Sequence, residues 1–153
     1  MHTRSSRLVT ALFAALVAAF FALPLAAATT SSVVNARVDA MDRMAVVLKR
    51  FLGRNVAQAS KATLQKNVAR LNTAAARILP LFPVGSGLGQ TNARPEIWTD
   101  WPAFTAKATA LQLETDLLAQ AVEAGDVAKV TIQARVVSQA CAACHQEFRN
   151  EPM

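Results

Sequence analysis

The sequence has 153 residues, which is a typical size for a single domain. Apolar residues make up 53% of it and charged residues 17%, a balance that excludes an intrinsically disordered protein. Two of the 16 basic residues lie in an N-terminal leader, which leaves 14 against 10 acidic residues. That surplus is too small for a nucleic-acid-binding protein. Five glycines, six prolines and no tyrosine oppose a fold of many short strands and favour helices.

The first 28 residues have the pattern of a secretory signal peptide. A basic start, Met1–Arg7, is followed by an apolar run, Leu8–Leu25, and by three alanines that end at Ala28. The run approaches the ~20 residues that cross a bilayer, so a retained membrane anchor is the alternative. A proline near the end of the run and the alanines after it favour cleavage. We therefore predict a signal peptide over residues 1–28, a mature domain over residues 29–153, and export to the periplasm.

The helical elements of the mature domain follow from the spacing of its apolar residues. Positions that recur every three or four residues predict helices over Val33–Val56, Ala59–Leu79, Ala103–Ala124 and Val127–Arg149. The segment Pro80–Pro102 is rich in glycine, proline and asparagine and is predicted to be the one long loop. The side chains predicted to face the core are Val34, Val38, Met41, Ala45, Leu48 and Leu52; Leu64, Val68, Leu71, Ala75 and Ile78; Phe104, Leu111, Leu118 and Val122; and Val130, Ala134, Val137, Cys141, Cys144 and Phe148.

The helix boundaries carry their own signals. Pro80 is expected to end the second helix, because proline has no N–H group to donate. Gly125 is expected to close the third helix, and Asp126 is a predicted N-cap of the fourth. Four amphipathic helices joined by two short connections and one long one predict an all-α fold, an antiparallel four-helix bundle.

Both cysteines of the chain, and the one histidine of the predicted mature domain, stand in the five residues CAACH from Cys141 to His145. The spacing C-x-x-C-H is that of covalent c-type haem attachment. Two thiols about one helical turn apart can add to the two haem vinyl groups, and the histidine that follows can bind the iron. On a helix, Cys141 and His145 share one face, along which the haem can lie. We predict one haem c on Cys141 and Cys144, with His145 as proximal iron ligand.

Three other interpretations of this motif are weaker. A structural zinc site needs four ligands, and the mature domain offers at most three of the usual type. A thioredoxin-like dithiol stands near the start of a βαβ unit, whereas this pair lies near the C-terminus of a helical pattern. A disulfide between Cys141 and Cys144 would strain helical geometry and leave His145 unexplained.

The C-terminal segment CAACHQEFR, from Cys141 to Arg149, resembles the ending of the class II c-type cytochromes, the cytochrome c′ family. In that family an aromatic residue and an arginine follow the histidine by three and four residues, as Phe148 and Arg149 do here. The loop segment Arg94–Trp98 (RPEIW) is similar to the one that precedes the third helix of the family. The resemblance implies a periplasmic four-helix bundle with one covalent haem, and often a homodimer formed through the first helices.

The resemblance also bears on the second axial position of the iron. One branch of the family places an apolar residue there and binds nitric oxide or carbon monoxide; the other places a methionine there and suits electron transfer. The family's cue is an arginine, three residues and then the distal position, which Arg37 and Met41 match. A glycine commonly follows the distal position by two turns, and counting back from Gly53 gives Ala45 instead. We predict Met41 as the distal iron ligand; the alternatives are Ala45, a small residue that would leave the iron open, and Met44, which lies three residues after Met41.

Other residues have less specific roles. Arg37 and Arg149 are candidates to pair with haem propionates. Trp98 and Trp101 are expected either to lie beside the haem or to close the end of the bundle. The scattered basic residues form a solvated face or guide an acidic redox partner.

The function predicted from these residues is that of a periplasmic electron carrier that works with redox partner proteins. The alternative is a five-coordinate haem protein that binds a diatomic gas, nitric oxide or carbon monoxide. A haem-free structural bundle remains only if the two cysteines carry no haem. No catalytic residues are predicted, because the mature domain has no second histidine and no evident general base near the motif. A homodimer is an expected form, and nucleic acid is not an expected partner.

Overall fold

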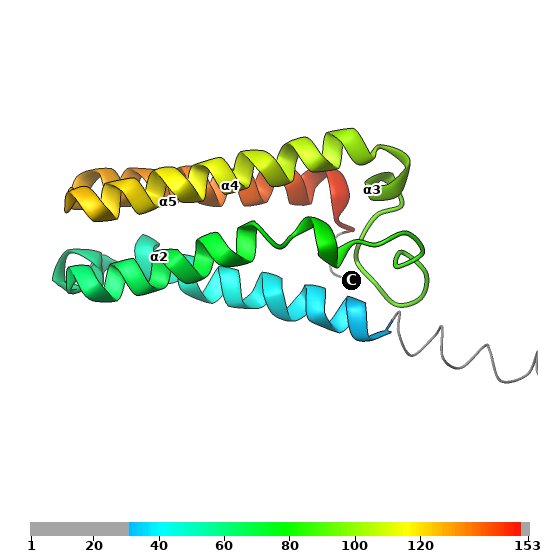
Figure 1. The fold of residues 1–153 in the computed structure, drawn as a ribbon, viewed down its shortest axis with the longest axis horizontal. Coiled ribbons are helices and arrows are strands. Elements are labelled where there is room, and N and C mark those ends of the chain that lie inside the picture. The colour runs from blue at the N-terminus through cyan, green and yellow to red at the C-terminus, as the bar shows by residue number, and fades with distance from the viewer. Residues whose placement is uncertain (1–30, 151–153) are drawn as a thin grey trace, which may run out of the picture.

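The computed structural model describes residues 31–150, and they form an antiparallel bundle of four long helices (Figure 1). The first helix occupies residues 31–52, and α2 (Lys61–Ala75), α4 (Trp101–Ala124) and α5 (Val127–Phe148) follow it. The predicted all-α four-helix fold is confirmed. The predicted signal peptide and its cleavage site lie outside the described residues. Within residues 31–150, no helix is both long and apolar enough to cross a membrane.

The two ends of the bundle are built differently (Figure 1). At the turn end, the 3₁₀ helix η1 (Arg54–Gln58) joins the first helix to α2, and Gly125 with Asp126 joins α4 to α5. At the loop end, residues 76–100 cross from α2 to α4. This connection contains the short helices η2 (Leu79–Leu81) and α3 (Glu96–Thr99).

Prolines shape the loop end. The prediction that α2 continues to Leu79 is wrong by a turn, because the helix ends at Ala75 and the chain tightens into η2. Pro80 cannot donate to a carbonyl four residues earlier, and its ring disfavours helical backbone at the residue before it. The single turn α3, within the predicted loop, starts directly after Pro95. Asp100 caps α4 by accepting a hydrogen bond from the backbone N–H of Ala103 at 3.2 Å.

The core runs between all four helices and matches most of the predicted stripes. All the residues predicted to face the core from α2 and α4 are buried. In α5, Val130, Ala134, Val137 and Phe148 are buried, and both cysteines pack against the core while staying partly exposed. Apart from Asn67 in α2 and Thr115 in α4, the buried residues of these faces are apolar, so their period reads directly from the sequence.

The predicted inner face of the first helix is wrong at three positions. Val38 is 53% exposed and Leu52 41% exposed, and Ala45 is exposed as well. The buried positions are Arg37, Met44, Leu48 and Phe51, with Met41 packed against them. This stripe keeps the helical period but begins with an arginine. A prediction from apolar residues alone passes over Arg37 and starts the stripe at the neighbouring Val38. It therefore assigns the wrong side of the helix to the core.

Candidate haem site

Helix α5 presents the C-x-x-C-H motif as part of one unbroken helix. Its first turn is capped by Asp126, whose carboxylate accepts from the Lys129 N–H at 3.0 Å. Beyond the last turn, the chain pairs with the loop. The Arg94 N–H donates to the Phe148 carbonyl at 3.0 Å, and the Asn150 N–H donates to the Asn92 carbonyl at 2.8 Å. Both ends of the helix that carries the motif are therefore fixed.

The three residues of the motif are each partly buried, and their surroundings set their protonation. Both cysteines are free thiols. Burial raises the pKa of Cys141, and burial together with the neighbouring Cys141 raises the pKa of Cys144 to about 11. A reactive dithiol needs a lowered pKa, so this is the opposite of a thioredoxin-like site. Burial and, to a smaller extent, the charge of Arg149 lower the pKa of His145. The neutral imidazole that binds a metal is thereby favoured.

The structure places the predicted distal residues on different sides of the first helix. Met41 is partly exposed and packs against the core. Met44 is only 5% exposed and belongs to the core itself. Ala45 is exposed and points away from it. The N-terminal half of the first helix and the C-terminal half of α5 lie at the same end of the bundle (Figure 1).

Arg37 is buried at the loop end and bonds to the loop. Its Nε donates to the Leu81 carbonyl at 3.1 Å, and its Nη2 donates to the same carbonyl at 3.0 Å and to the Ser86 hydroxyl at 2.7 Å. Its Nη1 donates to the Thr91 hydroxyl at 3.2 Å. The guanidinium carbon lies 4.1 Å from the ring centre of Phe82, a cation–π contact. Arg37 therefore fastens the first helix to the loop.

Arg37 is buried, with only 5% of its surface exposed, yet it has no carboxylate partner within residues 31–150. Burial lowers the pKa of Arg37, yet a guanidinium stays charged. Carbonyl, hydroxyl and aromatic groups are what stabilise this charge in the protein. Arg149, the other arginine of the predicted site, is exposed, and its backbone N–H donates to the His145 carbonyl at 3.0 Å.

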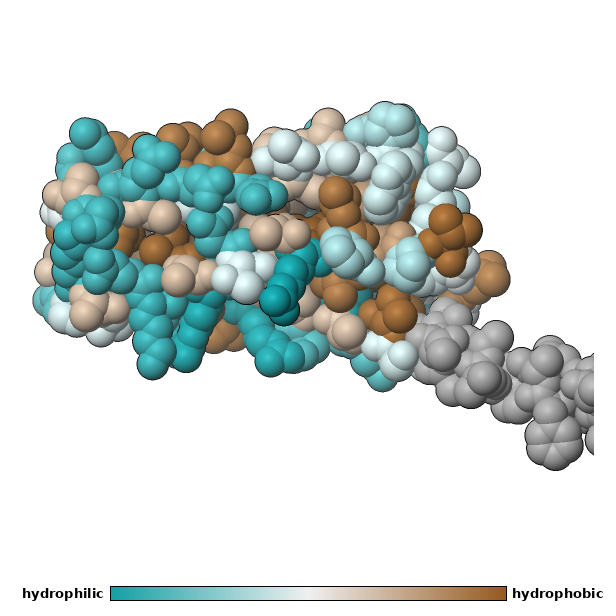
Figure 2. All heavy atoms as spheres, in the orientation of Figure 1, coloured by the Kyte–Doolittle hydropathy of each residue, from teal (hydrophilic) through white to brown (hydrophobic). Residues whose placement is uncertain are grey.

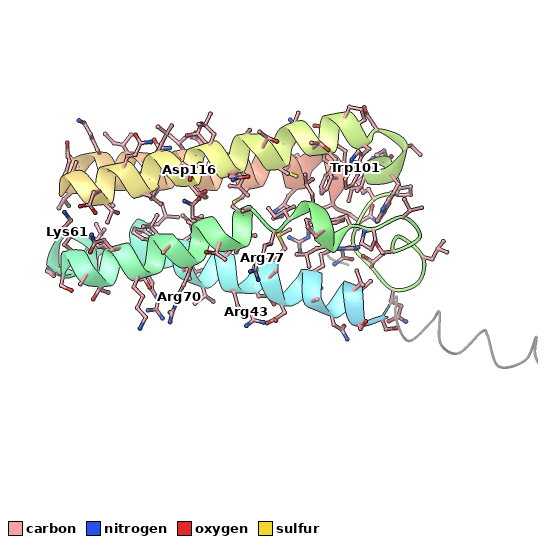
Figure 3. The ribbon with its side chains drawn as sticks, in the orientation of Figure 1. Arg43, Lys61, Arg70, Arg77, Trp101 and Asp116 are labelled. Carbon is pink, nitrogen blue, oxygen red and sulfur yellow. The ribbon has the colours of Figure 1, made fainter. Side chains whose placement is uncertain are left out.

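The two tryptophans belong to an aromatic cluster that closes the loop end. The Trp98 indole N–H donates to the carbonyls of Phe82 and Pro83 at 3.2 and 3.0 Å. Trp101 lies 5.5 Å from Phe104, ring centre to ring centre, and near the loop end in Figure 3. The cluster also explains why position 87 is a glycine, because a Cβ there would lie 2.5 Å from the Trp98 ring. The structure shows that the tryptophans close the loop end of the bundle, and a position beside the haem stays a prediction.

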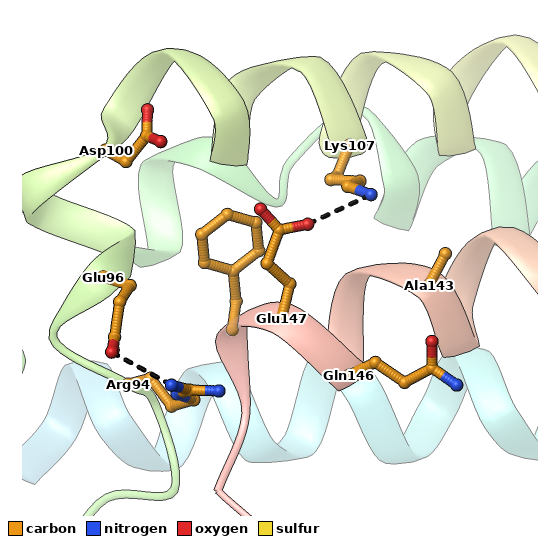
Figure 4. Close-up of a pocket in the computed structure, with 8 residues that line it drawn as sticks. Arg94, Glu96, Asp100, Lys107, Ala143, Gln146 and Glu147 are labelled. Atoms are coloured by element: carbon orange, nitrogen blue, oxygen red, sulfur yellow. Dashed lines mark hydrogen bonds and ion pairs between the residues drawn. The ribbon is translucent and has the colours of Figure 1, made fainter.

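A charged groove of about 550 Å³ lies beside the motif, between α3, α4 and the end of α5 (Figure 4). The residues that line it are Arg94, Glu96, Asp100, Lys107, Ala143, Gln146, Glu147 and Phe148. Two ion pairs cross or border it, Lys107–Glu147 at 3.1 Å and Arg94–Glu96 at 3.0 Å. The charges of each ion pair neutralise one another, and the Lys107–Glu147 pair joins α4 to α5. The Asp100 carboxylate, which also lines the groove, accepts the N-cap hydrogen bond of α4.

The residues present fit a covalent haem. The two thiols are unpaired and reachable, and they border apolar core on their inner side, as a macrocycle requires. The histidine beside them favours its neutral form. A four-helix bundle with this motif near the end of its last helix defines a class of protein, the c-type haem proteins built as helical bundles.

The comparisons with known proteins agree with this class. Residues 32–149 match the protein family described as Cytochrome C′. This chain belongs to the cytochrome c′ family, and the haem c that the family binds is its cofactor.

Two curated relatives and one solved structure illustrate the similarity. A cytochrome c′ of Alcaligenes xylosoxydans xylosoxydans is 37% identical over 90 residues, 59% of this chain and 69% of the relative. A cytochrome c-556 of Agrobacterium tumefaciens (strain B2A) is 31% identical over 87 residues, 57% of this chain and 70% of the relative. A nitric oxide complex of a mutant cytochrome c prime from Alcaligenes xylosoxidans superposes with a TM-score of 0.73 at 30% identity. The superposition covers 80% of this chain and 97% of the chain in that structure.

Sequence reasoning missed the polar contacts that hold the helices together. The Thr115 hydroxyl, fully buried in α4, donates to the Asn72 side-chain carbonyl at 2.6 Å. The Asn72 amide in turn donates to Asp116 at 2.7 Å. The available signal is a polar residue at a core position of an otherwise apolar stripe, which Thr115 and Arg37 share.

Proposed function

We propose that this protein is a periplasmic electron carrier in which Cys141 and Cys144 would attach a haem and His145 and Met41 would bind its iron. The observation that carries the proposal is the position of Met41, on the core side of the first helix, while Ala45 is exposed. When bound, the haem supplies an iron that changes between the ferric and ferrous states. The side chains of the bundle hold the ligands in place during that change.

Each ligand has a defined task. The neutral imidazole of His145 offers a nitrogen lone pair from a helix that is fixed at both ends. The thioether of Met41 is a soft, neutral ligand, which favours ferrous iron and raises the reduction potential. Arg37, one turn before Met41, fixes that turn of the first helix to the loop. Rigid ligands reduce the rearrangement that accompanies electron transfer.

The test is the spin state of the ferric protein. With Met41 as ligand, the ferric holoprotein near neutral pH is low-spin. Met41→Ala converts it to high-spin and admits carbon monoxide readily to the ferrous form, because the sulfur no longer occupies the sixth position. Met44→Ala, the matched control, removes a buried methionine one turn further on and leaves the spin state unchanged. Absorption and electron paramagnetic resonance spectra measure both.

Two results would contradict parts of the proposal. A high-spin spectrum from the unaltered protein would remove Met41 as ligand. If the mass of the matured protein does not include one added haem, covalent haem attachment is contradicted. The double variant Cys141→Ala, Cys144→Ala gives the reference mass of a protein without haem.

The alternative function is that of a five-coordinate haem protein that binds nitric oxide or carbon monoxide. It is favoured by one comparison, the nitric oxide complex formed by a mutant of the related cytochrome c prime. In this case Met41 packs against the core without reaching the iron. Rapid binding of carbon monoxide to the unaltered ferrous protein, at a rate that Met41→Ala does not change, would support the alternative.

The propionate roles of Arg37 and Arg149 are part of the proposal. Arg37 is a buried cation without a carboxylate partner in residues 31–150, and it uses four of its five N–H groups on the loop. A propionate would supply the counter-charge. Arg149 is exposed and lies one turn after His145, so its guanidinium is free to approach the same cofactor.

We propose that the first helices also form a homodimer. Val38, Ala45 and Leu52 are exposed and follow one another at seven-residue intervals, the spacing of a helix-to-helix contact. Leu52→Lys is expected to give a monomer in sedimentation experiments. Leu113→Lys, at a 57% exposed leucine of α4, is the control and leaves the dimer intact. A monomeric unaltered protein would contradict this part.

A further inference from the structure

Positive and negative charge are separated along the sequence. No acidic residue stands between Asp42 and Glu96, whereas that segment contains nine lysines and arginines. From Glu96 to Asn150, seven acidic residues face four basic ones. Because the first segment supplies much of the first helix and all of α2, and the second supplies α4 and α5, the bundle has a positive side and a negative side.

The positive side has a well-defined centre. We call it the basic face, and its residues are Arg43, Arg50, Lys66, Arg70 and Arg77. All five are exposed, and only Arg43 forms an ion pair within residues 31–150, with Asp39 in the preceding turn. Figure 3 shows Arg43 and Arg70 along the edge formed by the first helix and α2, away from α4 and α5, and Arg77 between the ribbons of the first helix and α2. Hydrophilic side chains dominate this edge in Figure 2.

The side chains between these cations indicate the kind of partner. In α2, the exposed neighbours of Lys66 and Arg70 are small or polar, such as Gln65, Ala69 and Thr73. None of the large exposed hydrophobic residues of the described chain lies between residues 53 and 83. A helix that binds a membrane surface needs an apolar face of large side chains beside its cations. The basic face lacks one on α2, and on the first helix one large apolar side chain, Val46, is exposed between Arg43 and Arg50. A charged surface with few apolar side chains is typical of the rim of a transient protein contact.

The basic face is separate from the surface proposed for the homodimer. At 3.6 residues per turn, Arg43 lies about 140° around the first helix from Val38. Lys66, Arg70 and Arg77 come from α2 and the turn after it. A second copy bound along Val38, Ala45 and Leu52 therefore leaves these cations available.

We infer that the basic face is the docking surface for an acidic patch on a protein redox partner. This inference rests on the proposed electron-transfer function. Unpaired cations on one side attract an acidic partner from a distance, orient it, and raise the association rate, while the contact stays weak enough to release after each transfer. On the other side of the bundle, four of the seven acidic residues are already in ion pairs, with Lys61, Arg94, Lys107 and Lys129. Within residues 31–150, that side offers the partner no cluster of unpaired cations, so the basic face sets the orientation.

The experiment uses the full holoprotein and a polyglutamate peptide as an acidic probe. Amide chemical shifts are followed by NMR as peptide is added. We expect the changes to concentrate in the first helix and α2, and to disappear as the salt concentration is raised to about 0.5 M, where screening is strong. Arg70→Glu should weaken binding about fivefold, since it removes one favourable charge and adds an unfavourable one.

Arg135→Glu is the matched control. Arg135 is an exposed arginine of α5 without an ion pair in residues 31–150, so the same change in net charge occurs outside the basic face. Equal weakening by both variants would overturn the inference, because only net charge would then matter. Absent binding of the peptide would overturn it too. Tighter binding to phosphatidylglycerol vesicles than to the peptide at equal salt would replace the protein partner by a membrane.

A potentiometric titration of the same samples separates this inference from the function on which it rests. A haem that cycles reversibly in a protein that does not bind the peptide removes the docking surface alone. The opposite result is also informative. If the protein binds the peptide through the basic face but its haem shows no reversible redox cycle, the acidic partner is retained. The electron-transfer role, and with it the redox part of the inference, is then removed.

Discussion

The two helical hairpins of this bundle are fixed by different means. The hairpin of α4 and α5 turns at Gly125 and Asp126, and it packs apolar side chains, two cysteines and one uncharged polar residue, Thr115, against the core. The first helix and α2 are joined by residues 53–60, and each helix buries a polar residue, Arg37 and Asn67. In one hairpin the turn residues set the register, whereas in the other a buried cation sets it from the far end. The comparison shows that helices of similar length need not be held by the same class of interaction.

The largest expected effect tests the register of the first helix. Phe51 has no exposed surface, and the adjacent Leu52 is 41% exposed. Phe51→Ala should lower the free energy of unfolding by about 3–5 kcal/mol, since it removes a fully buried ring and leaves a cavity. Leu52→Ala should cost about 0.5 kcal/mol in the monomer. Urea unfolding of both variants measures the difference, and a reversed order would restore the inner face that apolar spacing predicted.

The second prediction removes the cation that fixes the first helix. Arg37→Met should cost about 2 kcal/mol, because the Leu81 carbonyl and the Ser86 hydroxyl lose their donor in a buried place. Arg43→Met, the control, changes an exposed arginine whose one ion pair within residues 31–150 is with Asp39, and should cost about 0.5 kcal/mol or less. Equal losses in urea unfolding would show that the loop contacts of Arg37 contribute nothing.

The third prediction compares the two glycines at the turn end. Gly125 has φ of 71°, a left-handed conformation that costs other residues about 1–2 kcal/mol. Gly53 has φ of −76°, which any residue adopts, although an added Cβ would lie 3.3 Å from the Lys49 carbonyl. Gly125→Ala should therefore lower Tm more than Gly53→Ala. A larger effect at Gly53 would show that the longer connection is the more constrained of the two.

The smallest effect concerns the N-caps and their pH dependence. Hydrogen bonding to the Lys129 N–H lowers the pKa of Asp126, so its contribution to stability is present above the ordinary aspartate pKa. It is lost as the pH falls through the lower pKa of the folded protein. Ser60 caps α2 by accepting from the Thr63 N–H at 3.2 Å and does not titrate in this range. Hence the Tm loss of Asp126→Ala should shrink in acid, while that of Ser60→Ala stays constant.

The sequence allowed much of this structure to be predicted, and the hairpin comparison explains where prediction stopped. Caps and prolines are local, so Gly125 and Asp126 placed the turn of the second hairpin correctly. The C-x-x-C-H motif is equally local, and it carries the proposal that Cys141, Cys144 and His145 hold the haem. Arg37 bonds to residues 44 to 54 positions away, partly through backbone carbonyls. A backbone carbonyl is present at every residue, so the amino-acid sequence does not show which carbonyl accepts a distant hydrogen bond. Neither these contacts nor the helix register that they fix could therefore be predicted from the sequence.

The position of the aromatic cluster determines what optical experiments on this protein will report. Trp98 and Trp101 are its only tryptophans, and both lie at the loop end. Indole fluorescence therefore reports structural change at the loop end, around Phe82, Arg37 and Gly87. It does not report local change at the turn that contains Gly125. Far-ultraviolet circular dichroism averages over all four helices. Coincident melting curves from the two signals would mean that both ends separate together, whereas an earlier fluorescence change would identify the loop end as the first part to open.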